Sequence, residues 1–351
     1  MQRPSTIRVL AGRNAISHIQ QHGIQLADFT SMIGASGGPK WFCLYGLDQW
    51  FTQQIAQRRQ PLHLIGSSAG SWRFACYAQA DAKAASQRFC DAYRTIVYPQ
   101  YASVAEVTAI SATVLEAVFP SAEHVDQVLN NPWVHLNFVV AREKRWLKAR
   151  STAGKLAGLT LAAGANLLHR RSLAAFYERC IFQQQVEHSP FSAIRDLPTQ
   201  HIALTRDNLK PALLASGSIP LVLDPVLHIA GAGDGPFIDG GITDYHFDWP
   251  FSHHGLVLYP HFYPQVSPGW FDKGLKWRQP RRDHFANVVM ICPSDHWVQS
   301  LPYGKIPDRK DFKQLSDEAR IRYWQEVTVR SFELAEDLQA GHFKVEKLPW
   351  E

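Results

Sequence analysis

The sequence predicts an α/β protein with three layers, in which helices cover both faces of a central, mostly parallel sheet. Strand-like and helix-like segments alternate through the first third of the chain, which is the order that parallel sheets require. The chain has 351 residues, 46% of them hydrophobic, so it can bury a large core. No internal repeat or low-complexity linker marks a boundary, and we expect a single domain over residues 1–351.

Local hydrophobic patterns predict the individual elements. Short apolar runs predict strands at FTSMIG (29–34), LHLIG (62–66), FID (237–239) and NVVMIC (287–292). Apolar residues near helical spacing predict helices over residues 40–58 and 69–80, and a charged amphipathic pattern predicts one long helix over residues 311–341.

Charge and cysteine content indicate the cellular setting. The formal net charge is +5 with scattered Lys and Arg, which favours weak attraction to an anionic surface such as lipid headgroups and does not imply nucleic acid. No signal-peptide core and no apolar run of 18 residues is present, which predicts a cytoplasmic protein with peripheral membrane contact left open. Five widely spaced cysteines without a C-x-x-C pair predict buried thiols: Cys43, Cys76, Cys90, Cys180 and Cys292.

The stretch LHLIGSSAGSW (62–72) holds Gly66, Ser68 and Gly70 in a G-x-S-x-G frame. A predicted strand enters it and a predicted helix leaves it, which is the setting of a nucleophile elbow. The glycines permit a tight turn that holds the serine in a strained conformation with its hydroxyl exposed. Ser68 is therefore the candidate nucleophile, and the N–H of Ala69 at the helix N-terminus is a candidate oxyanion donor.

A glycine-rich loop, GASGGPKW (34–41), lies between the preceding strand and its helix. It does not fit a phosphate loop, because Pro39 stands where that motif needs glycine and Trp41 where a hydroxyl must hold magnesium. An oxyanion loop fits better: the N–H groups of Gly37 and Gly38 can turn toward a carbonyl oxygen, and the following helix adds its dipole.

A third candidate segment is FIDGGITD (237–244), in which Asp239 ends a predicted strand and Gly240 and Gly241 follow it. A carboxylate there can approach another loop closely and accept the proton of Ser68, or orient the group that does. D-G-G by itself is most often only a turn, so this segment supports a catalytic role for Asp239 only together with the other two segments.

In this order the three segments resemble the patatin-like phospholipase family, which has a glycine-rich oxyanion loop, a G-x-S-x-G elbow and a downstream D-G-[GA] motif. The matching residues are SGGPKW, GSSAG and DGG, and ALLASGSIPLVLDPV (212–226) is similar to the Ala-Ser-x-x-x-Pro segment that lines the family's site. The resemblance covers a motif-bearing core of about residues 28–250. It leaves residues 251–351 as a C-terminal extension of unmatched role.

The resemblance implies a patatin-like fold and a Ser-Asp dyad that works without histidine, metal or cofactor. Ser68 attacks an acyl ester of a phospholipid, a lysophospholipid or a related lipid, Asp239 is the base, and water then releases the fatty acid from the acyl-enzyme. The residues implied for the oxyanion hole are Gly37, Gly38, Lys40 and Ala69. Those implied to support the elbow and the loop are Gly66, Gly70, Gly240 and Gly241.

The glycine loop departs from the family pattern at three positions. Ser36 replaces the first glycine of the triplet, Trp41 replaces the closing glycine, and Pro39 has no N–H to donate. Lys40 keeps the cationic position. We therefore expect an altered oxyanion hole, which affects substrate class and rate more than reaction type.

Two alternatives stay open. An α/β-hydrolase esterase with a Ser-His-Asp triad needs a histidine after the acid, and His284, His296 and His342 stand in that order. The other alternative is a catalytically idle patatin-like protein that binds lipid, which the altered loop and the 11 Trp residues favour.

DYHFD (244–248) would place Asp244, His246 and Asp248 on one face if it were extended, where they could bind a metal. We favour hydrogen bonds that fix the loop after Asp239, and expect no metal.

KLAGLTLAAGANLL (155–168) is apolar, rich in small residues and too short to span a bilayer. Its length favours a buried helix, whereas its basic flanks favour a lid or interfacial helix that meets lipid headgroups. These flanks are Lys148, Arg150 and Lys155 before it and His169, Arg170 and Arg171 after it.

Overall fold

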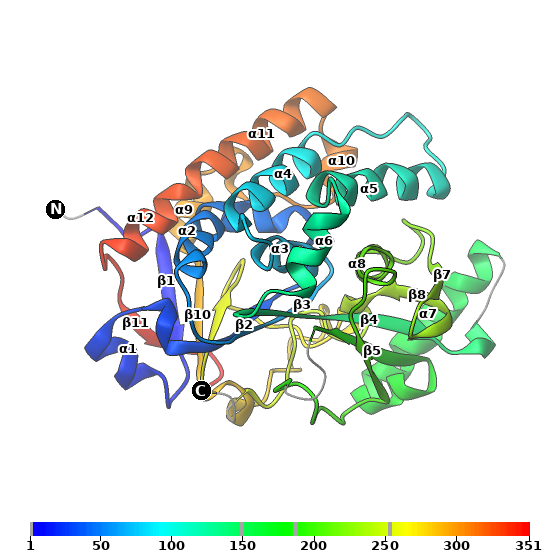
Figure 1. Ribbon diagram of the computed structural model, residues 1–351, viewed down its shortest axis with the longest axis horizontal. Helices are drawn as coiled ribbons and strands as arrows, with labels where there is room; N and C mark the ends of the chain where they lie inside the picture. The colour runs from blue at the N-terminus through cyan, green and yellow to red at the C-terminus, as the bar shows by residue number, and fades with distance from the viewer. Residues whose placement is uncertain (1–2, 148–150, 185–188, 252–254) are drawn as a thin grey trace.

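The computed structural model describes residues 3–147, 151–184, 189–251 and 255–351. Lys148 and Arg150, expected to flank the apolar segment 155–168, lie outside the described residues. The described chain forms a central, mostly parallel sheet flanked by helices (Figure 1). Its strands are β1 (Ile7–Ala11), β2 (Phe29–Gly34), β3 (Leu62–Ser67), β4 (Val134–Glu143), β5 (Tyr177–Gln183), β6 (Thr199–Ala203), β7 (Val226–Ile229), β8 (Gly233–Asp239), β9 (Leu256–Pro260), β10 (Val288–Pro293) and β11 (Val345–Lys347).

The main sheet runs in the order β11-β1-β10-β9-β2-β3-β4-β5-β6, and β7 and β8 branch from β4. The five strands from β10 to β4 are all parallel. Antiparallel pairs flank them, because β1 runs against β10 and both β5 and β8 run against β4. The central strands are largely buried along their length, as parallel strands covered on both faces are. The expectation of a central, mostly parallel sheet is confirmed.

The pairing of β4 brings two distant strand ends together. β5 occupies one edge of β4 over residues 137–143, so β8, which pairs with residues 140–142, must lie on the edge that β3 also uses. β3 ends with Ser67 opposite Val139, and β8 arrives from the other direction and ends with Asp239 opposite Val140. The carboxyl ends of β3 and β8 therefore face each other along one edge of one strand.

Helices pack around this sheet, and Figure 1 shows α2, α3, α4, α11 and α12 together on one side of it. Below the sheet in that view lie α1 and the largely irregular segment between β9 and β10. The helices are α1 (Ile16–His22), α2 (Tyr45–Ala56), α3 (Ala69–Tyr77), α4 (Ala82–Arg94), α5 (Val104–Val118), α6 (Ala122–Leu129), α7 (Thr152–Leu168), α8 (Leu209–Ser216), α9 (Asp295–Ser300), α10 (Asp311–Gln314), α11 (Asp317–Arg330) and α12 (Phe332–Gln339).

Serine side chains fix where several of these helices begin. Ser103 and Glu106 form a capping box at the start of α5, in which each side chain bonds the other's backbone N–H. Ser151 accepts a hydrogen bond from the N–H of Gly154 at the start of α7, and Ser316 accepts one from Ala319 at the start of α11.

The prediction of one long helix over residues 311–341 is wrong, because the segment forms three helices, α10, α11 and α12. A new helix begins after Ser316, which caps it. A second break falls at Ser331, whose carbonyl lies against α2 so closely that a Cβ on Gly46 would come within 2.3 Å of its oxygen. The side chain of Ser331 also accepts a hydrogen bond from the N–H of Gly46, so the chain bends where it contacts α2.

The sequence suggested that residues 251–351 form a C-terminal extension. In the structure the described part of this range is instead part of the central sheet and its helical cover. β9 lies between β2 and β10 in the middle of the sheet, and α12 packs on α2. The largest hydrophobic cluster correspondingly runs from Ile7 to Leu348. The expectation for the cysteines is confirmed, since all five are free and buried.

The apolar segment 155–168 forms most of α7, and its interpretation as a buried helix is wrong. Only Ala162 and Asn166 are buried within α7. Small residues on that side let it pack on a minor apolar cluster, while large side chains on its other sides remain exposed. These exposed side chains are Leu156, Leu161, Leu167 and Leu168, exposed by 55%, 60%, 50% and 84%.

Across the described residues, no single helix has both the length and the apolar composition needed to cross a membrane. α5 and α6 meet that test only when taken together, and they bend by 71° where they join.

Candidate active site

The meeting of β3 and β8 places Ser68 beside Asp239. The Oγ of Ser68 donates a hydrogen bond of 2.8 Å to Oδ2 of Asp239, although the two residues are 171 positions apart. Both side chains are buried, with 6% and 7% of the residue exposed. The two residues predicted as nucleophile and base therefore contact each other directly.

Ser68 sits on a sharp turn between β3 and α3. Its φ of 54° and ψ of −125° are unfavourable for a residue with a side chain, and such strain is typical of a nucleophile elbow. Ser216 of α8 holds the turn from outside, since its Oγ accepts a hydrogen bond from the N–H of Ser68 (3.0 Å) and donates one to the carbonyl of Val139 (2.7 Å). Ser216 belongs to the segment ALLASGSIP, which the sequence placed along the site.

The four supporting glycines are required by close packing. A Cβ on Gly70 would come within 2.0 Å of the carbonyl oxygen of Gly34, and one on Gly66 within 2.6 Å of the backbone of α3. After β8, a Cβ on Gly240 would meet the carbonyl of Val139 at 2.1 Å, and one on Gly241 would meet the Oγ of Ser36 at 2.6 Å. Larger residues at these positions would push the elbow and the aspartate loop apart.

The carboxylate of Asp239 is buried, and each of its two oxygens accepts a hydrogen bond. Burial raises the pKa of its carboxyl group, and the hydrogen bonds from Ser68 and from the N–H of Gly241 (2.7 Å), together with the charges of Arg309 and Lys273, act in the opposite direction. A carboxylate with a raised pKa is a stronger base than an ordinary aspartate, which suits it to accept the serine proton.

The glycine loop contributes backbone donors beside Ser68. Gly38 has a φ of +55°, which only glycine adopts easily, and the adjoining 3₁₀ helix η2 (Gly38–Leu44) begins there. None of the described residues accepts a hydrogen bond from the N–H groups of Gly37, Gly38 or Ala69. The N–H of Lys40 instead donates to the carbonyl of Gly37 (3.4 Å), so Lys40 contributes its side chain rather than its amide.

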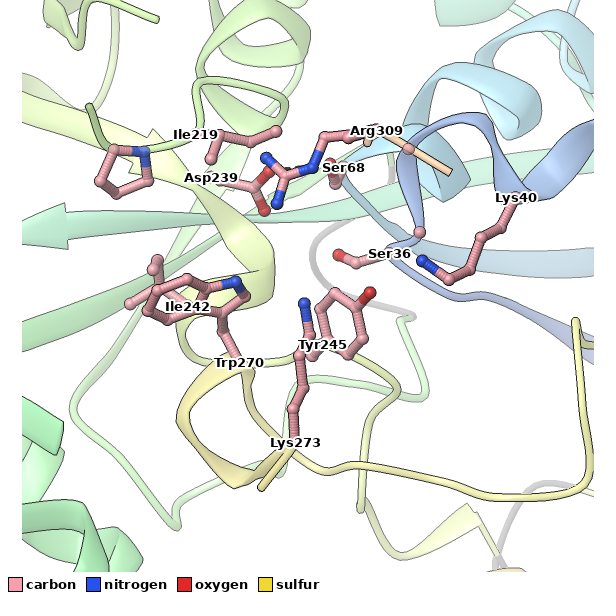
Figure 2. A pocket seen from close by; sticks show the side chains of 13 residues that line it. Ser36, Lys40, Ser68, Ile219, Asp239, Ile242, Tyr245, Trp270, Lys273 and Arg309 are labelled. Atoms are coloured by element: carbon pink, nitrogen blue, oxygen red, sulfur yellow. Dashed lines mark hydrogen bonds between the residues drawn. The ribbon is translucent and has the colours of Figure 1, made fainter. Parts of the chain in front are cut away.

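A small polar pocket of about 50 Å³ opens at Ser68 and Asp239. Figure 2 shows the side chains of Lys40, Lys273 and Arg309 directed toward the same space. The pocket is lined by Ser36, Gly37, Gly38, Lys40, Ser68, Ile219, Pro220, Asp239, Ile242, Tyr245, Trp270, Lys273 and Arg309. Three of these lie in segments that the sequence did not connect with the site, namely Trp270, Lys273 and Arg309.

A second, larger cavity of about 640 Å³ begins at the same serine and extends in another direction. It is lined by residues of α3, α4 and α5, by the turn that follows α8 and by the segment 309–313, and most of its wall is apolar. The lining residues include Trp72, Tyr93, Ile96, Tyr98, Val107, Val114, Ile219, Val222, Leu223 and Phe312. Ser68, Gly38, Ile219 and Arg309 line both spaces, so the serine stands at the junction of a cationic pocket and an apolar cavity.

No described histidine lines either space. His284 bonds Asp248 (2.9 Å) and His342 bonds Asp337 (3.1 Å), while His296 lies exposed on α9. The carboxyl oxygens of Asp239 bond Ser68 and Gly241, and among the described residues no hydrogen bond joins Asp239 to a histidine.

The segment DYHFD makes separate contacts rather than one cluster. Asp244 forms a fully buried ion pair with Arg179 (2.6 Å), which anchors the chain that follows Asp239. His246 accepts a hydrogen bond from the N–H of Ser267 (3.0 Å), and Asp248 bonds His284. Across the part of the chain that the structure describes, no group of three or more His, Cys, Asp or Glu side chains is placed to hold a metal ion.

The residues that sequence reasoning missed come from the chain after the last recognised motif. Lys273 and Arg309 lie 34 and 70 positions beyond Asp239 in no recognisable pattern. Only the return of β9 and β10 into the sheet carries their loops back to the elbow. Comparison of the chain with protein-family models, curated proteins and solved structures gave no match.

Proposed function

We propose that this protein is a patatin-like serine acyl hydrolase that cleaves fatty-acyl esters of phospholipids, lysophospholipids or related lipids. The observation that carries the proposal is the 2.8 Å hydrogen bond from Ser68, on a strained elbow, to the buried Asp239. The apolar cavity that starts at Ser68 supports a fatty-acyl substrate, because its mostly apolar wall can accommodate a hydrocarbon chain.

Acylation follows from this geometry. Ser68 Oγ bonds to the acyl carbon while its proton passes to Asp239, and the carbonyl oxygen becomes an oxyanion. The N–H groups of Gly37, Gly38 and Ala69, from which no described residue accepts a hydrogen bond, stabilise that charge, and the N-terminus of α3 adds its dipole. The carbon–oxygen bond to the alcohol then breaks, and Asp239 returns the proton to the departing alcohol oxygen.

Deacylation repeats these roles with water. Asp239 accepts a proton from a water molecule, whose oxygen attacks the acyl carbon held on Ser68. The bond to Ser68 breaks, its oxygen recovers the proton from Asp239, and the fatty acid leaves. No histidine takes part in either step.

We assign this activity to the surface of a membrane in a reducing compartment, the cytoplasm. Five free, buried cysteines support the compartment. The exposed leucines of α7 support contact with lipid, as does the mouth of the apolar cavity, where Tyr101 is 93% exposed and Lys310 and Lys313 add positive charge.

The test is hydrolysis of p-nitrophenyl acyl esters and of phospholipid vesicles, together with labelling by a fluorophosphonate probe. Wild-type protein should hydrolyse both and be labelled at Ser68, whereas Ser68→Ala should lose about 10³-fold or more in kcat/KM and all labelling. Ser300→Ala, on α9, is the control and should behave as wild type. Activity that survives Ser68→Ala overturns the proposal, and an unlabelled wild-type Ser68 identifies a lipid-binding protein without catalysis.

A further inference from the structure

Three cationic side chains converge beside Ser68 from three separate segments. Lys40 belongs to the glycine loop, Lys273 follows the 3₁₀ turn η7 (Trp270–Asp272), and Arg309 precedes α10. All three line the small pocket, and Figure 2 shows their charged ends turned toward its centre.

This positive charge is only partly offset in the described part of the chain, where the carboxylates of Asp308 and Asp239 attract Lys40 and Lys273 from a distance. None of the three side chains takes part in an ion pair there. The single carboxylate in the lining is Asp239, which already accepts hydrogen bonds from Ser68 and Gly241. Burial, together with repulsion from Lys40 and Arg309, lowers the pKa of Lys273 to about 7.

The protein therefore keeps an unfavourable concentration of like charge in a partly buried pocket. Lys273 obtains partial compensation from the ring of Tyr245, whose centre lies 3.7 Å from Nζ. Such a cluster is stabilised when an anion enters, because an anion supplies hydrogen-bond acceptors and relieves the repulsion.

The position of the pocket defines which part of a substrate it receives. The acyl chain fills the apolar cavity on one side of Ser68, so the alcohol portion of the ester lies on the other side, in the cationic pocket. The pocket is small, at about 50 Å³, and Ile219, Ile242 and Trp270 close it with apolar walls. It therefore fits one compact anionic group.

We infer that Lys40, Lys273 and Arg309 bind a terminal phosphate on the alcohol portion of the ester, which makes the substrate a monoacyl ester of a small phosphorylated alcohol. This inference rests on the proposed acyl hydrolase function. Ser68 forms a bond to the acyl carbon, the carbon–oxygen bond of the ester breaks, and the phosphorylated alcohol leaves with its proton and with its phosphate unchanged. The C-terminal region thereby supplies two of the three phosphate-binding residues of a site whose nucleophile and base come from the earlier motifs.

The test compares two esters that share one acyl chain, 1-acylglycerol 3-phosphate and 1-acylglycerol. Wild-type protein should prefer the phosphorylated ester by about tenfold or more in kcat/KM. Lys273→Gln and Arg309→Gln should each lower that ratio by about tenfold, because each removes a charge-assisted hydrogen bond to phosphate. Arg322→Gln, an exposed arginine on α11, is the matched control and should keep the wild-type ratio.

Inorganic phosphate separates the pocket from the chemistry. Calorimetry should detect phosphate binding to wild-type protein, and weaker binding to Arg309→Gln with an unchanged circular dichroism spectrum. If neutral esters are hydrolysed but the ratio stays near one in all variants, the inference is overturned and the proposed function stands. If no ester is hydrolysed while phosphate binds through Lys273 and Arg309, the anion site stands and the proposed function is overturned. If wild-type protein binds no phosphate and its kcat/KM ratio for the two esters is near one, the proposed phosphate site is excluded.

Discussion

At the scale of single residues, the backbone of Ser68 is the clearest departure from relaxed geometry in the site. A φ of 54° costs free energy in any residue other than glycine, and the surrounding structure must hold it in place. The hydrogen bond from Ser68 N–H to Ser216 and the close packing of α3 supply that restraint. The strain turns Oγ toward Asp239 and leaves the adjacent N–H of Ala69 without an acceptor among the described residues.

Asp239→Asn should lower kcat/KM by about 10²–10⁴-fold, because the amide cannot accept the serine proton. It should not lower Tm at neutral pH. Burial raises the pKa of folded Asp239, so the folded protein binds that proton more tightly than the unfolded chain, and wild-type stability falls as pH rises through the raised pKa. The uncharged amide avoids that loss. Ester hydrolysis and thermal unfolding monitored by circular dichroism measure the two effects.

The control for this prediction is the pH dependence of the difference in Tm between wild type and Asp239→Asn. At a pH below the ordinary range of an aspartate, Asp239 is protonated in both folded and unfolded chains, and the Tm of wild type and variant should converge. A variant that is less stable than wild type at neutral pH would mean that the carboxylate stabilises the fold, contrary to the effect of burial.

At the scale of elements, β4 decides where the site forms. β3 and β8 share its edge and end at neighbouring residues, Val139 and Val140. The elbow and the aspartate loop each begin where one of these strands ends, so strand register brings the nucleophile and the base to neighbouring positions. The glycines allow the two turns to approach the neighbouring backbone.

Gly70→Ala should lower the free energy of unfolding by about 3 kcal/mol, because the new Cβ would stand 2.0 Å from the carbonyl oxygen of Gly34. Gly164→Ala is the matched control. Gly164 lies exposed inside α7, and a methyl group added there would have nothing within 4 Å, so the same change should stabilise the protein by about 0.5–1 kcal/mol. Urea titration measures both, and equal effects at the two sites would contradict the packing argument.

Replacing Leu161 and Leu168 of α7 by Asp should reduce co-sedimentation with anionic vesicles by about tenfold, because two apolar side chains would leave the lipid. Folding should be unaffected, since these side chains are 60% and 84% exposed. The double change Gln325→Asp with Gln339→Asp adds the same charge on α11 and α12 and should bind vesicles as wild type does. Equal loss in both double variants would show that charge alone matters.

At the scale of the whole molecule, the two spaces beside Ser68 are assembled from segments far apart in the chain. The apolar cavity joins residues from α3, α5 and the segment 309–313, and the cationic pocket joins residues from the glycine loop, the region after β9 and the same segment 309–313. The central position of β9 and β10 in the sheet makes this assembly possible. The C-terminal hundred residues are therefore part of both the core and the site.

Val107→Trp should shift the preferred acyl chain to a shorter length, because Val107 lines the cavity and a larger side chain would fill part of it. We expect hydrolysis of a p-nitrophenyl palmitate to fall by about tenfold relative to the butyrate. Ala105→Trp, on the exposed side of the same helix, should keep the wild-type preference. An unchanged preference in Val107→Trp would exclude the cavity as the acyl site.

The sequence by itself determined the local features: the first strands and helices, the strained elbow at Ser68, the glycine loop and the aspartate at the end of a strand. These depend on residues close together in the chain, where hydrophobic period and glycine spacing report the backbone directly. Three predictions from the sequence were wrong: one long helix over residues 311–341, a buried helix over residues 155–168, and a C-terminal extension over residues 251–351. Each of these features depends on contacts with distant segments.

Only the tertiary structure decided which of these features meet. The shared edge of β4 joins Ser68 to Asp239, and the return of β9 and β10 brings Lys273 and Arg309 to them. A lone Lys or Arg carries no local pattern that marks it as part of a site, because its role depends on charges contributed by other segments. Strand order and register are properties of the folded sheet, and they set the chemistry of this site.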